Sequence, residues 1–124
     1  MKYSLSYCDI TKISENIFEV VSKEGIVIDK NCAEEAWHFW DGLRKEPFGL
    51  LVNTQNSFSH SFEGARDIGL HPLQKKTALL SCNDKQETEF KTALQIKQVT
   101  GHNASHKTFR NRNEAIEWLN DLNS

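Results

Sequence analysis

The residues with the clearest chemical potential stand together in one polar stretch of the chain. Ser57, Ser59, His60 and Ser61 follow an apolar run at Leu50–Val52. Hydroxyl groups beside an imidazole suit three kinds of chemistry: nucleophilic catalysis, phosphorylation, and hydrogen bonding to the unpaired backbone N–H groups at a helix start. The same residue types are therefore compatible with a functional site, catalytic or phosphorylated, and with a helix cap that has only a structural role.

Catalysis is the weakest of the three interpretations. Ser59 and His60 are adjacent in the sequence, whereas a nucleophile and its base must meet through space, with a third group orienting the base. The chain also has no G-x-S-x-G elbow. We therefore expect no catalytic residue and no enzyme.

The other two interpretations stay open for this stretch. Capping accounts for one serine, because a helix has one N-cap position. A phosphate on Ser59 or Ser61 would lie against the positive end of the next helix, so the turn could also be a switch or an anion-binding loop. We take Ser57, Ser59, His60 and Ser61 as candidates for partner binding or phosphorylation.

The remaining histidines suggest a metal site only at first sight. His102 and His106 are four residues apart, a spacing that places two rings on one face of a helix. Their segment contains Gly101 and Asn103 and looks like a loop leading into a strand. It offers no cysteine or carboxylate at structural-zinc spacing. We expect neither a metal ion nor another cofactor.

Hydrophobic periodicity predicts the elements that must position the polar stretch. Two strands are expected within Tyr3–Ile28, and a helix from Asn31, with Glu34 completing a capping box and with Trp37 and Trp40 on its core face. The later elements are expected in the order strand 48–52, helix 62–69, strand 77–81, helix 84–99, strand 107–110, and a helix capped by Asn111.

The order β-β-α-β-α-β-α-β-α predicts one α/β domain over residues 1–124. Its sheet is expected to be mixed, mostly parallel and five-stranded, with four covering helices. Functional groups of such sheets gather at the carboxyl ends of the strands. The polar stretch follows one of those ends.

Composition restricts the environment and the partners. The net charge of −2 and the scattered lysines and arginines argue against nucleic acid. Three widely spaced cysteines indicate reduced thiols and a cytoplasmic protein. No run approaches the roughly 20 apolar residues of a membrane span. The sequence leaves the oligomeric state open.

The final segment of the chain carries a resemblance to a known family. Residues 109–119, FRNRNEAIEWL, are similar to the F-x-(D/N)-x-x-E-A-x-x-W-L ending of SpoIIAA-like bacterial proteins of the STAS/SEC14 type. Gly25, Ile28 and Asp29 resemble the G-x-L-D passage of STAS domains, with one residue more between them. The resemblance covers nearly the whole chain and implies the STAS fold.

The resemblance also implies two functions for this chain. In regulatory STAS proteins, a serine at the helix start after the third strand is phosphorylated by a partner kinase, and the matching region here is Asn53–Ser61. The Asp-Ser pair of those proteins is absent. The first expectation is a non-catalytic regulatory module whose partner is a regulatory protein or a kinase. Because SEC14-type relatives carry apolar ligands, the alternative is a protein that binds a small lipid-like or anionic ligand under the second helix.

Overall fold

A computed structural model describes residues 1–81, 84–99 and 105–121, and in these ranges it shows two β-sheets and four helices. The larger sheet consists of Lys2–Ser4 (β1), Cys8–Ser14 (β2), Ile17–Ser22 (β3), Phe48–Asn53 (β5), Gln74–Leu80 (β7) and Ser105–Phe109 (β8). The smaller sheet, called the ribbon below, consists of Ile26–Ile28 (β4) and Phe58–His60 (β6). The helices are Lys30–Leu43 (α1), Phe62–Asp67 (α2), Asp84–Val99 (α3) and Arg112–Asn120 (α4).

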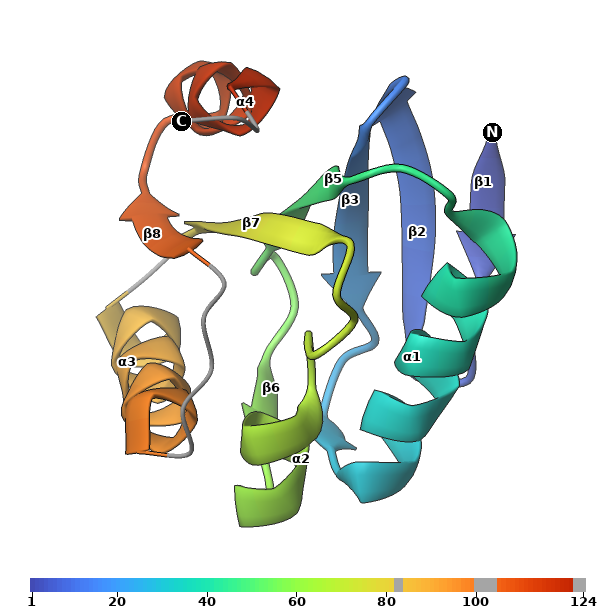
Figure 1. Ribbon diagram of the computed structural model, residues 1–124. Helices are drawn as coiled ribbons and strands as arrows, with labels where there is room; N and C mark the ends of the chain where they lie inside the picture. Colours follow the sequence, from blue (N-terminus) through green and yellow to red (C-terminus); the bar gives the residue numbers. More distant parts are fainter. Residues whose placement is uncertain (82–83, 100–104, 122–124) are drawn as a thin grey trace.

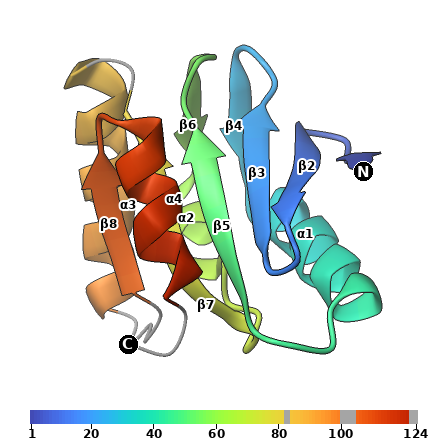
Figure 2. The same cartoon turned by 90° about the horizontal axis from the view of Figure 1, so that it is seen from above.

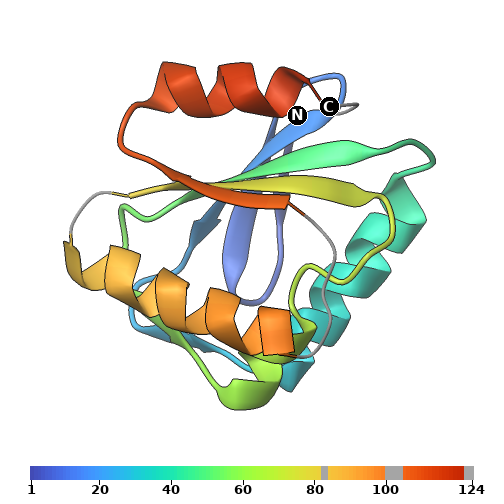
Figure 3. The ribbon, with the colours of Figure 1, turned by 60° about the vertical axis from the view of Figure 1, so that its left-hand side comes forward.

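The larger sheet has the order β1-β2-β3-β5-β7-β8. β1, β2 and β3 pair antiparallel, and β3, β5, β7 and β8 pair parallel. α4 covers one face, while α1, α2 and α3 lie on the other (Figures 1 and 3). The expected mixed α/β sheet with four helices is confirmed, although the larger sheet has six strands rather than five.

The additional strand arises at the start of the chain. The apolar residues Leu5 and Tyr7 suggest one strand there, but the chain turns between β1 and β2. The backbone N–H of Leu5 donates to the carbonyl of Cys8 at 2.8 Å and closes this turn. β2 then continues through polar residues to Ser14, because its pairing with β3 requires no apolar side chain on the outer face.

The ribbon is the second departure from the expectation. Residues 58–60 were expected to be loop, yet they pair in parallel with β4, in the register Ile26↔Phe58, Val27↔Ser59 and Ile28↔His60. Figure 2 shows the ribbon beyond the ends of β3 and β5. It therefore extends the carboxyl edge of the sheet, where parallel α/β folds place their sites.

The helix caps follow one expectation and contradict another. The side chain of Asn111 accepts a hydrogen bond from the Glu114 backbone N–H at 3.1 Å and caps α4, as expected. The expected cap of α1 at Asn31 is wrong. Asp29 has the extended backbone of an N-cap, and its carboxylate accepts from the Cys32 N–H at 3.0 Å.

Two hydrophobic cores lie on the two faces of the larger sheet. Ile17 and Leu51 pack against Ala115 and Leu119 of α4 on one face. The larger core lies between the sheet and α1 and includes the aromatic residues Phe18, Trp40 and Phe48. The ring centroids of Trp40 and Phe48 are 4.5 Å apart. Trp37, also expected in the core, is 38% exposed, so only one tryptophan of α1 is a core residue.

Candidate functional site

The polar stretch is divided between the two faces of the ribbon. Successive side chains of a strand point to opposite faces. Phe58 and His60 therefore share one face of β6 and line a cavity in the protein interior, whereas Ser59 lies beside Val27 on the other face. Ser59 and His60 are thus not arranged as a nucleophile and its base.

The two serines outside β6 have different environments. Ser57 is exposed; its backbone N–H donates to the Glu24 carboxylate at 2.9 Å, and its carbonyl accepts from the N–H of Gly25 at 2.8 Å. Ser61 is the N-cap of α2, and its Oγ accepts from the backbone N–H of Gly64 at 3.0 Å. Of the sequence-predicted site residues, one serine therefore caps a helix.

His60 joins the ribbon to α3. Its side chain is 7% exposed, and its Nδ1 lies 3.3 Å from Oε1 of Glu89. The same carboxylate oxygen accepts from the backbone N–H of His60 at 2.9 Å. Two contacts to one carboxylate fix the imidazole at the inner face of β6. The ring of Phe58 lies 5.6 Å from the imidazole, centroid to centroid.

A shallow groove lies between the ribbon and α3. It encloses about 430 Å³ and is lined by Gly25, Ile26, Ser57, Phe58, Ser59, Lys85 and Glu89. Ser57 and Ser59 therefore share one surface, together with one cation and one anion. The structure brings these two serines together and places His60 behind them.

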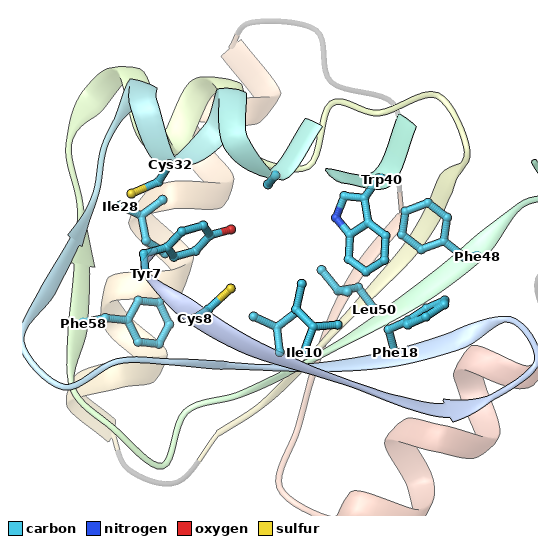
Figure 4. Packing of buried hydrophobic residues seen from close by; sticks show 12 residues of the cluster. Tyr7, Cys8, Ile10, Phe18, Ile28, Cys32, Trp40, Phe48, Leu50 and Phe58 are labelled. Carbon is cyan, nitrogen blue, oxygen red and sulfur yellow. The ribbon is translucent and has the colours of Figure 1, made fainter. Parts of the chain in front are cut away.

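The cavity behind the ribbon has a volume of about 70 Å³. Its walls come from the sheet, the ribbon, α1 and the segment after α2, and most of them are apolar, including Ile10, Val20, Ile28, Leu50 and Val52. Figure 4 shows Tyr7 and Trp40 below α1 on either side, with Ile10 and Leu50 between them. The cavity thus lies within the larger core, at the end of the sheet next to the ribbon.

Gln74 is the most unusual residue in the cavity wall. Its side chain is buried, with 5% of the residue exposed. Its Nε2 donates to Oγ1 of Thr77 at 2.9 Å, but its Oε1 has no hydrogen-bond partner within the described parts of the chain. A buried acceptor without a partner costs about 1–3 kcal/mol. Gln74 was not among the residues predicted from the sequence, because a glutamine ahead of two lysines resembles an exposed strand start.

Gly69 lies beside the Gln74 amide. It has a φ of +78°, which favours glycine, and a Cβ there would approach Nε2 of Gln74 to 3.1 Å. The hydrogen bond to Thr77 orients the amide, and the absence of a side chain at Gly69 leaves room for it. The unpaired oxygen is a fixed feature of the cavity wall rather than an exposed side chain that can turn to water.

The titratable residues on the cavity wall favour neutral occupants. Burial raises the pKa of the Tyr7 hydroxyl well above its usual value, so this group is uncharged at neutral pH. Burial likewise raises the pKa of the adjacent Cys8 thiol to about 12. Among the described residues, no Asp, Glu, Lys or Arg lines the cavity. His60 and His106 also line it, and Nδ1 of His60 already lies against Glu89. An ion would lose its hydration there without a carboxylate, lysine or arginine of the described wall to pair with it.

No group of three or more His, Cys, Asp or Glu side chains within residues 1–81, 84–99 and 105–121 is placed to hold a metal ion. His106 lies on β8, and His102 is outside the described residues. Within the described chain, no helix has both the length and the apolar character needed to cross a membrane.

Comparison with known proteins shows a relationship of fold. No family model matches the chain, and no curated protein has a matching sequence. A solved protein from Shewanella loihica PV-4, an uncharacterized member of the DUF3478 family with a SpoIIAA-like fold, superposes with a TM-score of 0.58. The match covers 96% of this chain and 98% of the other at 18% identity. The fold is SpoIIAA-like.

The residues that suggested the SpoIIAA-like fold have structural roles. In the final segment, Ala115 and Leu119 are fully buried under the sheet, and the rings of Phe109 and Trp118 lie 5.6 Å apart. Asp29 caps α1. Of the residues that carry the resemblance, Ile28 also lines the cavity. The sequence offered a ligand site only as the alternative, under the second helix, and did not predict which residues would line this cavity.

Proposed function

We propose that this SpoIIAA-like protein is a non-catalytic cytoplasmic module that binds a small, mainly apolar molecule in the cavity behind the ribbon. The observation that carries the proposal is the buried cavity with one unpaired acceptor, Oε1 of Gln74, in an otherwise largely apolar wall. Ligand pockets typically combine apolar walls with a few fixed polar groups. Cys8 and Cys32 are free, which supports a reducing compartment.

The position of the cavity connects ligand binding to regulation. Phe58 and His60 contact the cavity from the inner face of β6, while Ser59 lies on the outer face of the same strand. A ligand that contacts the inner face would favour one position of a strand only three residues long. Regulation would follow if the outer face were recognised by another protein.

The first experiment fills the cavity. Val20 and Val52 line it from β3 and β5, so a Val20→Ile, Val52→Ile double variant adds two methyl groups to the space. Val21→Ile is the matched control, because Val21 follows Val20 on the same strand and points to the opposite face. Each protein is titrated with propan-2-ol while its amide and methyl NMR signals are followed.

The proposal predicts saturable shifts at the cavity residues of the wild type and of Val21→Ile. It predicts their loss in the double variant. Unfolding by urea shows whether the double variant folds, and filling a void should leave it at least as stable as the wild type. Shifts of equal size in all three proteins, or none in the wild type, would rule out the cavity as the binding site for such molecules.

A second candidate function is regulation through a protein partner at the outer face of the ribbon. Val27, which pairs with Ser59, is 50% exposed, and Phe62, the first residue of α2, is 61% exposed. Ser57 and Ser59 would then be recognised directly or phosphorylated by a kinase. This surface suits a partner with a complementary apolar patch.

Purification of the tagged protein from its native cells tests the second candidate. Ser57→Ala, Ser59→Ala is compared with Ser14→Ala, an exposed serine on β2. The candidate predicts a companion protein, or phosphate on Ser57 or Ser59, that the double variant loses and the control retains. Identical companions in both variants and unmodified serines would discard it.

A further inference from the structure

The Gln74 amide gives the cavity a chemical preference. One N–H of its Nε2 donates to Thr77, and its Oε1 is the buried side-chain acceptor of the cavity wall for which the described chain shows no partner. A bound molecule that offers a donor satisfies Oε1. A molecule that offers only acceptors leaves Oε1 unpaired. The cavity therefore distinguishes molecules by their donors.

The size of the cavity limits the part of a ligand that can enter. An engineered cavity of about 150 Å³ holds benzene. The cavity here is about 70 Å³. A cavity with roughly half the volume of the benzene-binding one holds a group of about three or four heavy atoms. Short branched or linear aliphatic groups meet this limit, and a larger molecule would bury only such an end.

Charge restricts the ligand further. The described residues of the cavity wall include no carboxylate, lysine or arginine. A buried ion without a partner is strongly disfavoured, so the entering part is neutral. Apolar contacts with residues such as Leu50, Val52 and Phe58 then supply most of the affinity.

We infer that the cavity recognises a short neutral aliphatic group that carries a hydroxyl or N–H donor, and that this donor bonds to Oε1 of Gln74. The inference rests on the proposed function and specifies its ligand class. Gln74 is the specificity residue, and Thr77 is the positioning residue that keeps its amide oriented, while Gly69 leaves room for the amide.

The test compares two probes of equal size. Propan-2-ol and acetone each have four heavy atoms, but only propan-2-ol has a hydrogen-bond donor. Both are titrated into the full chain and their dissociation constants are measured from NMR shifts of the cavity residues. The wild type should bind propan-2-ol more tightly than acetone by roughly two- to tenfold, the range that one net hydrogen bond provides.

Gln74→Met supplies the matched variant, because methionine keeps the length of the side chain and removes the acceptor. It should abolish the preference for propan-2-ol while still binding both probes. Gln55→Met, at an exposed glutamine before the ribbon, should keep the preference. The wild-type comparison requires no variant, so it remains decisive if Gln74→Met does not fold.

The outcomes separate the inference from the proposed function. If neither probe produces saturable shifts at the cavity, the proposed function fails. If both bind with equal affinity, or acetone binds more tightly, the cavity binds small molecules but the assignment of Oε1 as a donor-seeking group is wrong. If the preference persists in Gln74→Met, another residue causes it. If a single ordered water bonded to Oε1 resists displacement by either probe, the inference is also overturned.

Discussion

Arg112, the first residue of α4, donates two hydrogen bonds to the carboxylate of Glu19 on β3, at 2.6 and 2.8 Å. The amide of Asn53 donates a third at 2.9 Å. These contacts attach the last helix to the middle of the sheet. The hydrogen bonds from Arg112 are the main reason that the pKa of Glu19 lies below its usual value.

This ion pair predicts a pH-dependent contribution to stability. Because the folded-state pKa of Glu19 is lowered, its stabilising effect is present above the unfolded-state pKa and is lost as the pH falls through the folded-state pKa. Glu19→Gln should therefore lower the free energy of unfolding by about 1 kcal/mol at pH 7. The difference from wild type should shrink steadily below about pH 4. Urea denaturation of both proteins across this range measures it, and a difference that is independent of pH would contradict the assignment.

Two glycines in helices predict opposite effects of adding a methyl group. A Cβ at Gly64 in α2 would lie 1.9 Å from the carbonyl oxygen of Ile28, which is backbone and cannot move aside without displacing the ribbon. Gly64→Ala should destabilise the protein by about 1–3 kcal/mol or more. At Gly42 in α1 nothing lies within 4 Å, so Gly42→Ala should stabilise it by about 0.5–1 kcal/mol. Equal effects at the two positions would show that α2 does not press against the end of β4.

The cap of α1 predicts a contrast between two neighbouring polar residues. Asp29→Ala removes the acceptor for the Cys32 N–H and should lower the midpoint of thermal unfolding. Asn31→Ala should leave the midpoint nearly unchanged, although the sequence alone favours Asn31 as the cap. Circular dichroism at a helical wavelength follows both transitions. A larger drop in the unfolding midpoint for Asn31→Ala than for Asp29→Ala would contradict the assignment of Asp29 as the N-cap of α1.

The hydrogen bond between Gln74 and Thr77 predicts a non-additive pair of substitutions. Thr77→Val alone leaves both ends of the buried amide unpaired and should cost about 1–3 kcal/mol of unfolding free energy. Combining it with Gln74→Met removes both polar partners, so the double variant should be close to the wild type or more stable. Chemical denaturation of the wild type, both single variants and the double variant completes the cycle. Additive losses would mean that Gln74 and Thr77 do not interact in the native protein.

The fold could be predicted from the sequence wherever side-chain patterns coincide with backbone structure. Asn111 followed by Glu114 marked the start of α4, and the apolar residues of β5 marked a central strand. The ribbon could not be predicted, because β6 has only three residues and depends on its pairing with β4. The paired residues Ile26 and Phe58 are 32 positions apart in the sequence. Such pairing is a property of the whole fold rather than of a local pattern.

The candidate site was predicted less completely than the fold. The sequence correctly indicated that one serine of the polar stretch caps a helix, and Ser61 is that residue. It did not separate Ser59 from His60, because their opposite orientations depend on the strand that was missed. Gln74 offered no signal, since its burial results from the packing of Gly69 and Thr77 around it. Whether Ser57 and Ser59 contact a partner stays a prediction.

The most direct test of the central claim is a measurement of intermolecular nuclear Overhauser effects between propan-2-ol and the methyl groups of the protein. The account predicts transfer from the probe to methyl groups of Ile10, Leu50 and Val52, which line the cavity. It predicts none to Ile116, which lies against the opposite core below α4. Transfer only to exposed residues such as Leu70, or to none, would contradict the claim that the cavity behind the ribbon is the binding site of this protein.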